Sequence, residues 1–457
     1  MTGQPLGRSS RAGRPAPPVR ILHLGLGNFF RAHQAWYTDR CPDSDGWGYA
    51  AFAGRSSWLA DALRAQDGLY TLVTRGATED HFEVVGSLAR PHRADEHEAW
   101  LSYWRSAAMV VVTSTITEAG YLHGPTGGID TSSPAVRSDI EALRSGNPTA
   151  VRTGPARMIA GLAARRAAEA GPVTVVPCDN LAANGAVMDE VLTGMAALVD
   201  PALASWMQDS VSYVTTVVDR ITPGVSAEEA ERLAGITGFA DRCPVLTEPF
   251  SEWVMSGTFL GGRPSWESSG AIFTDDAEPY ERRKLWLLNG AHSLMAYAGS
   301  MRGHTTVPEA IADPTCRAWI DDWWLEASRH IPLSDQQIAG YQAELLRRFA
   351  NVRMADRLAR IAQDGSHKIP VRVLPVLSEE RASGRMPRGA LRILAGWICH
   401  LRGAGAPVDD AGAEQVVPLA QGPIGEAARR ILDWLDPSYG SDGDLVAALV
   451  AETLSLG

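Results

Sequence analysis

The chain has 457 residues, of which 45% are hydrophobic and 21% are charged, and its formal net charge is -11. These are ordinary values for a folded globular protein, and the length predicts about two or three domains. The net acidic charge and the lack of a long Lys/Arg run argue against a nucleic-acid partner or an anionic membrane surface. No window approaches the ~18 consecutive apolar residues of a membrane span, which argues against a transmembrane segment.

The first 18 residues, MTGQPLGRSSRAGRPAPP, are rich in Arg, Pro, Gly and Ser and contain no apolar run. Such a segment buries too little apolar surface to fold, and it lacks the hydrophobic region of a secretory signal. We therefore predict a disordered tail over residues 1–18 and a cytoplasmic protein.

Ordered structure is predicted to begin at Val19, where an apolar run to Leu26 ends in glycines and is followed by the helical segment RAHQAWYTDR. Strand, glycine-rich turn and helix in this order open a dinucleotide-binding unit. The ordinary strand-to-helix turn is the alternative, but the position at the start of a βαβ pattern favours the cofactor.

The turn reads Gly25-Leu26-Gly27-Asn28-Phe29-Phe30. The first glycine allows the tight turn and the second lets the backbone approach a pyrophosphate, whereas Phe30 stands where the motif has its third glycine. We expect Gly25, Gly27, Asn28 and Phe29 to bind the cofactor, with different packing at the start of the helix.

The end of the second predicted strand, residues 49–54, bears on the choice of cofactor. An acid there would bind the adenosine ribose of NAD, whereas Arg with small hydroxyl residues suits a 2′-phosphate. The sequence reads Ala53-Gly54-Arg55-Ser56-Ser57. Arg55 is therefore a candidate cofactor-binding residue, unless it is only a solvated surface arginine, and the predicted cofactor is NAD, with NADP as an alternative.

Further β-rich runs occur at 108–115, 173–179 and 212–221, and helical patterns lie between them at 154–171 and 185–199. Strands alternating with helices predict an α/β fold with a doubly wound, mostly parallel sheet. After Asp276 long amphipathic helical segments dominate, including 334–351 with a Ser334/Gln337 capping box. We predict a Rossmann-type dinucleotide-binding domain over 19–276 and a mostly α-helical substrate-binding domain over 277–457.

The five cysteines are widely spaced and odd in number, and no CxxC pair occurs. Neither a disulfide framework nor a cysteine metal site fits this pattern, so we expect buried free thiols and no metal ion.

The stretch YERRKLWLLNGAH, residues 280–292, contains two incompatible catalytic patterns. Tyr280 and Lys284 form the Y-x-x-x-K pair of short-chain dehydrogenases, with Ser268 and Ser269 upstream. Yet that pair lies within a single domain in those enzymes, whereas here it follows the whole predicted α/β unit. Both patterns stay open at this point.

Lys284, Asn289 and His292 form the second pattern, and at 100° per residue they fit on one helical face of about 140°. Interconverting an alcohol and a ketone needs a base for the hydroxyl proton and donors for the developing alkoxide. Lys284 supplies the base if its pKa is lowered, Asn289 a neutral amide donor, and His292 a group that orients a hydroxyl. The helix is apolar almost all round, so these polar groups are expected to be buried.

The chain resembles the polyol-specific long-chain dehydrogenase/reductase family, typified by mannitol 2-dehydrogenase and fructuronate reductase. The resemblance covers about residues 20–440 and rests on seven motifs in the same order. They are GLGNFFRAHQA (25–35), AQDGLYTLV (65–73), TITEAGY (115–121), PCDNLAANG (177–185), VVDRITP (217–223), EPFSEWV (248–254) and KLWLLNGAH (284–292).

The resemblance implies an NAD(P)-dependent oxidoreductase that works without metal, and it implies roles for single residues. Lys284 matches the general base, Asn180 and Asn289 the paired oxyanion donors, and His292 a substrate-positioning residue. The remaining matches are Glu281 for a proton-relaying carboxylate and Asp219, Arg360 and Lys368 for substrate-binding residues. Gln363 replaces a histidine that is frequent in the family, which leaves the exact sugar open.

We therefore predict interconversion of a polyol (mannitol or arabinitol type) or an aldonate with its ketose or keturonate. A carboxylate substrate would need a further cation, which Arg360, Lys368 or Arg372 could supply. The alternatives are a Tyr280/Lys284 mechanism of the short-chain type and a nucleotide-binding sensor without catalysis. The family includes monomers, so a monomeric state is compatible with the resemblance.

Overall fold

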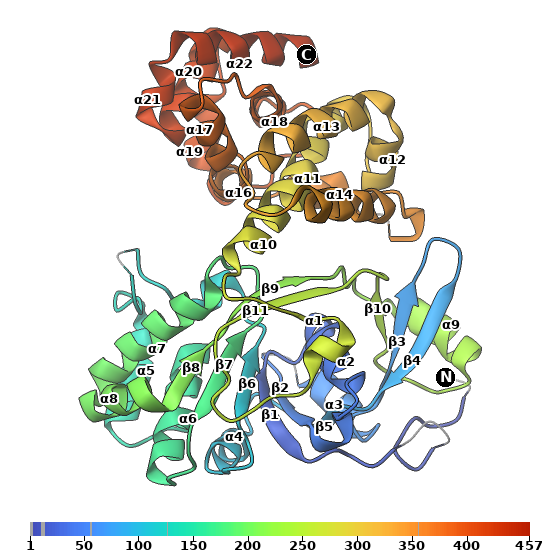
Figure 1. Ribbon diagram of the computed structural model, residues 1–457, viewed down its shortest axis with the longest axis vertical. Helices are drawn as coiled ribbons and strands as arrows, with labels where there is room; N and C mark the ends of the chain where they lie inside the picture. The colour runs from blue at the N-terminus through green and yellow to red at the C-terminus, as the bar shows by residue number, and fades with distance from the viewer. Residues whose placement is uncertain (1–2, 11–13, 55–56, 126, 355) are drawn as a thin grey trace. The chain divides into compact units, whose positions relative to one another are not determined.

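The computed structural model describes residues 3–10, 14–54, 57–125, 127–354 and 356–457, and the chain divides into two compact units, Met1–Ala277 and Glu278–Gly457. All strands of the described residues belong to the first unit, and the second unit is built of helices (Figure 1). The prediction of a Rossmann-type α/β half followed by a mostly helical half is confirmed.

The first unit is organised around a six-stranded parallel sheet with the order β5-β2-β1-β6-β7-β8. This is the doubly wound order, in which the direction of winding reverses between β1 and β6. The strands are β1 Val19–Leu24, β2 Gly48–Phe52, β5 Leu88–His92, β6 Val111–Ser114, β7 Val173–Pro177 and β8 Val211–Tyr213.

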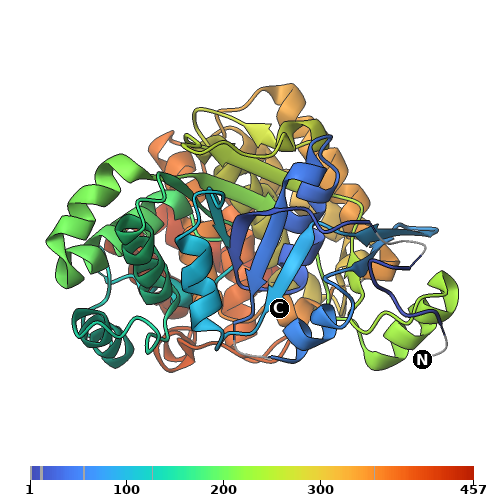
Figure 2. The same ribbon diagram turned by 90° about the horizontal axis from the view of Figure 1, so that it is seen from below.

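Alternate residues of these strands enter two separate cores, because successive side chains point to opposite faces of a sheet. Ile21 and Tyr49 belong to one core, and their neighbours Leu22 and Ala50 belong to the other. Helices α1 Asn28–Ala32, α2 Gln34–Asp39 and α3 Trp58–Arg64 contribute to the first core. The second core receives α4 His97–Trp104, α5 Pro134–Arg144, α6 Gly154–Ala167, α7 Asn184–Val199 and α8 Pro201–Ser210, and Figure 2 shows the teal and green helices of this group beside the blue strands.

Two three-stranded sheets complete the first unit. One has the order β10-β3-β4 and the other β12-β11-β9. Their strands are β3 Tyr70–Arg75, β4 Asp80–Val85, β9 Thr215–Asp219, β10 Val245–Thr247, β11 Glu252–Ser256 and β12 Ile272–Phe273, and helix α9 Ala227–Thr237 lies between β9 and β10 in the chain.

The run 212–221, predicted as one strand, is two strands in different sheets. The Val214 amide still donates to Val175 of β7, whereas β9 leaves that sheet and pairs antiparallel with β11. The change of sheet carries Asp219 away from the direct continuation of β8. Residue types with high strand propensity (Tyr, Val and Thr) continue across the break from Tyr213 to Val218, which is why the sequence pattern did not reveal it.

The prediction of a disordered tail is wrong for the described part of residues 1–18. Gln4 forms two backbone hydrogen bonds, with Gly238 and Ala240, and Leu6 is only 2% exposed in a cluster with Leu69 and Phe239. Arg8 donates to five backbone carbonyl groups, those of Asp67, Arg14, Pro15, Gly86 and Leu88. One buried leucine and one guanidinium group thus fix a segment whose composition alone indicates disorder.

The second unit contains thirteen α-helices and two π-helical segments among the described residues. In chain order they are α10 Glu278–Arg283, the π-helix η4 Lys284–Gly290, α11 Ala291–Leu294, the π-helix η5 Met295–Gly299, α12 Val307–Ala312, α13 Pro314–Ser328, α14 Asp335–Phe349, α15 Leu358–Ile361, α16 Gly365–Arg372, α17 Leu374–Ala382, α18 Arg388–Leu401, α19 Ala413–Leu419, α20 Ile424–Leu435, α21 Pro437–Gly440 and α22 Gly443–Leu456. The largely buried α18 packs against η5, α13 and α22. The predicted Ser334/Gln337 capping box is present at the start of α14.

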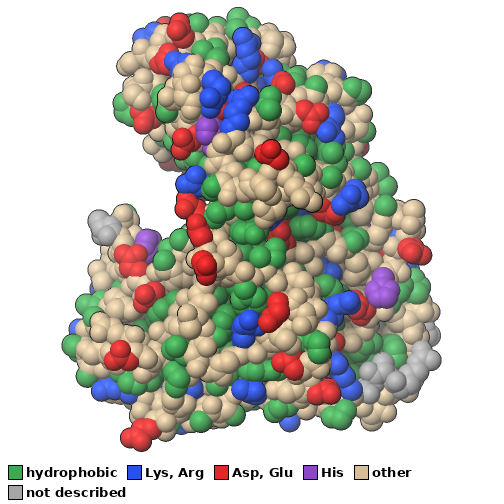
Figure 3. All heavy atoms as spheres, in the orientation of Figure 1, with side chains coloured by type: hydrophobic (Ala, Val, Ile, Leu, Met, Phe, Trp, Pro, Cys, Tyr) green, Lys and Arg blue, Asp and Glu red, His purple; other side chains and the backbone are tan. Residues whose placement is uncertain are grey.

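Charged side chains of both signs lie on the surface (Figure 3), and the cysteines have the state predicted from the sequence. Acidic and basic side chains are interspersed on the face drawn in Figure 3. All five cysteines are buried free thiols. Within the described residues, no helix has the length and apolar character needed to cross a membrane.

Candidate active site

A pocket of about 470 Å³ lies in the first unit at the carboxyl ends of β1, β6 and β7. Its lining residues come from the segments that follow these strands and from β9. They are Phe29, Thr115, Ile116, Thr117, Glu118, Ala119, Cys178, Asp179, Asn180 and Val218. Doubly wound sheets bind ligands at this edge, next to the point where the strand order reverses.

The turn after β1 is shaped to admit a ligand close to its backbone. Gly25 has a φ of +114°, and a Cβ atom there would lie 2.4 Å from the Thr115 carbonyl oxygen. The amides of Gly25 and Leu26 both donate to the Phe52 carbonyl at 3.0 and 2.9 Å, which folds the turn onto β2. Gly27 begins α1 without a side-chain cap, so nothing covers the first turn of the helix from that position. These features fit a dinucleotide.

Phe30, at the position of the missing third glycine, is fully buried. Its ring stacks on His23 of β1 with 3.7 Å between centroids and meets the edge of Tyr49 at 5.0 Å. Burial lowers the pKa of His23 to about 3, and its Nδ1 lies 2.8 Å from the Thr113 hydroxyl. The neutral imidazole and the phenyl ring therefore fill the space that a glycine would leave for close approach of helix and strand.

The other predicted cofactor residues have distinct environments. The Asn28 amide oxygen accepts a hydrogen bond from Arg31 at 2.6 Å, which stabilises the first turn of α1. Phe29 lines the pocket and stacks on His33 at 4.9 Å. Arg55 lies outside the described residues.

Asn180, a predicted oxyanion donor, is exposed at the rim of this pocket in the turn that follows β7. The preceding Asp179 fixes that turn, because its carboxylate accepts hydrogen bonds from the Leu181 amide at 3.1 Å and from the Tyr121 hydroxyl. Burial raises the pKa of Asp179 to about 6. Neither Asp179 nor Tyr121 was predicted as a site residue from the sequence, although both lie inside the motifs PCDNLAANG and TITEAGY.

Asp219 is the last residue of β9 and is 5% exposed. Asp219 stands directly opposite Glu252 of β11 in the antiparallel register, so two buried carboxylate side chains lie next to each other on adjacent strands. The following Arg220 donates to the carbonyl oxygens of Ala32 and Glu248, which anchors the end of the strand.

In the second unit Lys284, Asn289 and His292 are carried by η4 and α11, and all three are half-buried. The angles predicted from 100° per residue need correction, because Lys284–Gly290 is π-helical. Hydrogen bonds from residue i to i+5 widen the turn, so Lys284 and Asn289, five residues apart, lie about one π-turn from each other. Short π-helical segments of this kind are frequent at functional sites.

Side-chain donors from neighbouring helices satisfy carbonyl oxygens of η4. The indole N–H groups of Trp323 and Trp324 donate to the carbonyls of Trp286 and Leu287 at 2.8 and 2.9 Å. Arg372 donates to the Asn289 carbonyl at 3.4 Å. These contacts fix the backbone that carries Lys284 and Asn289.

The other residues of this helix are placed as follows. His292 packs against Phe349 of α14 with 5.0 Å between ring centroids. Glu281 and Tyr280 are half-buried on α10, and the Arg283 guanidinium lies 5.0 Å from the Tyr280 ring centroid. Ser269, one of the serines of the short-chain pattern, belongs to the first unit, where its hydroxyl contacts the Cys41 thiol at 3.4 Å.

The predicted substrate-binding cations differ in exposure. Arg360 is exposed and is paired with Asp356 one turn earlier, at 2.5 Å. Lys368 is half-buried and donates to the backbone carbonyls of Ile361 and Gln363. The Gln363 amide, at the position where the family often has histidine, donates to Asp409 at 2.6 Å.

Residues 19–268 match the model of the mannitol dehydrogenase Rossmann domain, and residues 276–426 match that of the mannitol dehydrogenase C-terminal domain. The chain belongs to the mannitol dehydrogenase family. The predicted family and the oxidoreductase class are thereby confirmed.

Relatives within the family include D-mannonate oxidoreductase of Escherichia coli, 33% identical over 86% of this chain and 81% of the relative. D-arabinitol 4-dehydrogenase of Ralstonia nicotianae is 36% identical over 87% of this chain and 85% of its own. The structure of Pseudomonas fluorescens mannitol 2-dehydrogenase, in ternary complex with NAD and D-mannitol, aligns with a TM-score of 0.81 and 32% identity over 100% of this chain and 94% of that chain.

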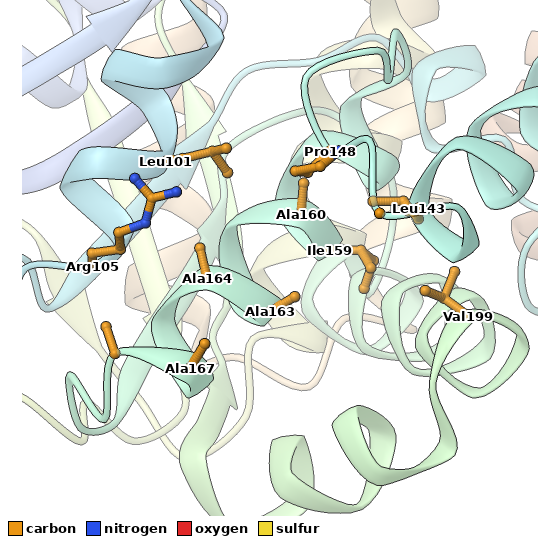
Figure 4. Close-up of a pocket in the computed structure, with 12 residues that line it drawn as sticks. Leu101, Arg105, Leu143, Pro148, Ile159, Ala160, Ala163, Ala164, Ala167 and Val199 are labelled. Carbon is orange, nitrogen blue, oxygen red and sulfur yellow. The ribbon is translucent and has the colours of Figure 1, made fainter.

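A second pocket, of about 440 Å³, lies on the outer side of α6 (Figure 4). Alanine, leucine, isoleucine, valine and proline side chains line it, and Arg105 is the one charged lining residue. This pocket lacks the convergent polar groups that would orient a substrate, in contrast to the pocket beside Asn180.

One group of three side chains in the described residues has the spacing of metal ligands: His304, Asp313 and Cys316. The Asp313 carboxylate is already engaged, because Arg302 and His304 donate to one of its oxygens at 2.5 and 2.9 Å and the Thr315 amide donates to the other at 2.8 Å. Burial raises the pKa of the Cys316 thiol to about 12, which favours the protonated form. This mannitol dehydrogenase family member therefore uses Asp313 to cap α13 and to pair with Arg302.

Proposed function

We propose that this protein is an NAD-dependent secondary-alcohol dehydrogenase that interconverts a polyol or aldonate with its ketose or keturonate. The family match carries the proposal, because it covers both units and the matched relatives act on a hexitol, a pentitol and a sugar acid, as their names state. We further propose that the first unit is the dinucleotide-binding domain and the second the substrate-binding domain.

Lys284 is the general base in this proposal. In the direction of oxidation its neutral amine accepts the proton of the substrate hydroxyl, and in the direction of reduction its ammonium group returns that proton. The half-buried position on an apolar π-helix supports this role, because desolvation favours the neutral amine. Glu281, one turn earlier on α10, is the proposed proton relay to the lysine.

Asn180 and Asn289 are the proposed donors to the substrate oxygen as negative charge develops on it. Neutral amides suit this task, because they stabilise the alkoxide without protonating it. The Asp179–Leu181 hydrogen bond supports Asn180, and the Arg372 contact supports the backbone at Asn289. His292 and Asp219 orient the substrate hydroxyl groups.

The cofactor is proposed to occupy the pocket after β1, β6 and β7, with Gly25, Gly27, Asn28 and Phe29 holding it. NAD, when bound, supplies the hydride acceptor for the carbinol carbon. The chemistry as proposed needs no metal ion, since Lys284 takes the proton and the two amides stabilise the charge. NADP remains the alternative cofactor, because Arg55 is a candidate to bind its 2′-phosphate.

The test is a spectrophotometric screen of neutral polyols and aldonates with NAD and with NADP at several pH values, for the wild-type protein and Lys284→Ala. We expect NAD reduction with at least one substrate, and about a 10²- to 10⁴-fold lower kcat for Lys284→Ala, the range contributed by general bases. Tight binding of NADH without turnover of any substrate would support a nucleotide-binding sensor instead. Near-wild-type turnover of the variant at every pH would remove the role of Lys284.

A further inference from the structure

A short segment of the first unit joins the glycine turn after β1 to the turn that carries Asn180. It consists of residues 115–121, which follow β6. At its start the Thr115 hydroxyl donates to the Gly25 carbonyl at 2.8 Å. At its end the Tyr121 hydroxyl donates to the Asp179 carboxylate, and four of the residues in between line the pocket. One wall of the pocket is therefore bonded to both turns.

The two ends of the Asn180 turn are fixed by hydrogen bonds to neighbouring strands. At the beginning, the Cys178 amide donates to the Ser114 carbonyl of β6 at 2.8 Å. At the end, the fully buried Asn184 side chain pairs with the Thr216 backbone of β9. Its Oδ1 accepts from the Thr216 amide at 2.9 Å, and its Nδ2 donates to the Thr216 carbonyl at 3.1 Å. The position of Asn180 between these ends depends on the contacts of the residues beside it.

Asp179 holds the middle of the turn. One of its carboxylate oxygens accepts from the Leu181 amide at 3.1 Å, which closes the backbone around Asn180. The other oxygen accepts from the Tyr121 hydroxyl. The orientation of the Asp179 side chain, and with it the path of the backbone at Asn180, is therefore set by the place of that hydroxyl group.

Tyr121 has the properties of a group that positions its neighbours and does not itself react. It is 0% exposed and is not among the residues that line the pocket, so it acts through Asp179 and not on a ligand. Its ring packs in the second core, which fixes the hydroxyl group in space. Burial, and after it the charge of Asp179, raises the pKa of Tyr121, so the phenol stays protonated and donates.

We propose that Tyr121 is a positioning residue of the dehydrogenase, which acts through Asp179 to place the Asn180 amide beside the bound cofactor. The substrate oxygen that Asn180 contacts belongs to the carbon that exchanges hydride with the nicotinamide, so the amide and the cofactor need a fixed separation. The 115–121 segment sets that separation, because it is bonded to Gly25 at one end and to Asp179 at the other. This inference rests on the proposed dehydrogenase function and adds a residue to its mechanism.

The experiment measures kcat and KM with NAD for the wild-type protein and Tyr121→Phe, on those of D-mannitol, D-arabinitol and D-mannonate that the wild-type protein oxidises. Removal of the hydroxyl group should lower kcat about 10- to 100-fold, because a small displacement of a donor slows the chemical step. NADH affinity, measured by fluorescence titration, should stay near the wild-type value, because the Gly25 amide keeps its own bond to β2. Tyr439→Phe is the matched control: it loses a hydroxyl hydrogen bond to Ser378 in the second unit, so its kcat should be unchanged.

Variants of Asp179 separate positioning from support of the fold. Asp179→Asn keeps an acceptor for the Leu181 amide and offers an amide N–H to the Tyr121 oxygen, so it should retain most of kcat. Asp179→Ala lacks both partners and should lose at least as much as Tyr121→Phe. The double variant Tyr121→Phe/Asp179→Ala should be no slower than Asp179→Ala alone, since the two side chains act as one unit. Urea unfolding of each variant identifies those that are folded under assay conditions.

A wild-type kcat in folded Tyr121→Phe would overturn the inference, and so would independent, additive losses in the double variant. A parallel loss of NADH affinity in Tyr121→Phe would overturn it too, because the residue would then serve cofactor binding. Where Tyr121→Phe is too unstable to assay, the Asp179 variants decide, and equal kcat in Asp179→Asn and Asp179→Ala would contradict the positioning role. Absence of wild-type turnover on every substrate would contradict the proposed function itself, and the inference would fall with it.

Discussion

The indole N–H of Trp323 donates to the Trp286 carbonyl oxygen at 2.8 Å, and a Cβ atom added to Gly290 would lie only 2.6 Å from the same indole ring. A single tryptophan thus holds the π-helical backbone through a hydrogen bond and requires a glycine at its next turn. The sequence NGAH joins the proposed oxyanion donor and the substrate-positioning histidine through this glycine. The absence of a side chain at residue 290 is therefore required for the positions of both Asn289 and His292.

Gly290→Ala should destabilise the protein by about 1–3 kcal/mol, because the added methyl group has no room against the Trp323 ring. It should also reduce kcat at least tenfold by displacing Asn289 and His292. Chemical unfolding and steady-state kinetics measure the two effects. Gly340→Ala is the control: this exposed glycine of α14 meets nothing within 4 Å, so alanine should be neutral or slightly stabilising.

Gly25→Ala should weaken NADH binding at least tenfold, because alanine is strained at a φ of +114° and its Cβ would collide with the Thr115 carbonyl. Fluorescence titration with NADH measures the affinity. Gly46→Ala, whose added methyl group would meet nothing within 4 Å, should bind NADH as the wild-type protein does. Unchanged affinity in Gly25→Ala would place the dinucleotide elsewhere.

Tyr280→Phe should keep kcat within about threefold of the wild-type value, since the proposed proton acceptor is Lys284 of η4 and the phenol belongs to the preceding helix α10. The measurement is kcat as a function of pH on the substrate found by the screen. A fall of two orders of magnitude or more would favour the short-chain mechanism, in which the tyrosine hydroxyl transfers the proton.

The Asp179 carboxyl should make stability depend on pH in a predictable direction. Its pKa is raised to about 6 by burial, so the folded state binds a proton that the unfolded chain has already released above about pH 4. The stabilisation from this group is complete below about pH 4 and is lost as the pH rises through 6.

Asp179→Asn removes that dependence. Its stability relative to the wild-type protein should therefore increase by roughly 1–2 kcal/mol between pH 4.5 and pH 7.5, a value reduced from the full shift because the side chain is partly solvated. Urea unfolding at the two pH values checks this. Asp436→Asn is the control: hydrogen bonds from Ser438 lower the pKa of exposed Asp436, so this carboxyl is ionised in both the folded and the unfolded state at both pH values and the stability difference should not change between them. An unchanged difference at both pH values would show that Asp179 titrates like a solvated acid.

The periodic parts of the fold could be predicted from the sequence. The strands of the parallel sheet and the change to helices after residue 276 follow from hydrophobic runs and amphipathic spacing, which report local burial. The capping box at Ser334 was predictable because both partners are three residues apart. The residues proposed for the site were predicted from sequence motifs, whereas their burial and hydrogen-bond partners are known only from the structure.

The remaining features depend on contacts between distant segments, which a linear pattern does not contain. The π-helix at Lys284 has donors from Trp323, Trp324 and Arg372, far along the chain. The stacking of Phe30 on His23 joins a helix to a strand, and the break between β8 and β9 depends on which strand is the partner. Local composition also does not indicate that Leu6 packs against Leu69 and Phe239, which are distant in the chain.

Because Leu6 is buried, the folded first unit begins earlier in the chain than the family match does. The Rossmann-domain match begins at residue 19, whereas Leu6 is buried between Leu69 and Phe239. A recombinant version started at Val19 would hold every family motif and still expose an apolar patch on the surface of the first unit, inviting aggregation at high concentration. Expression work on this protein should therefore treat the leading residues as part of the fold and place affinity tags at the other terminus.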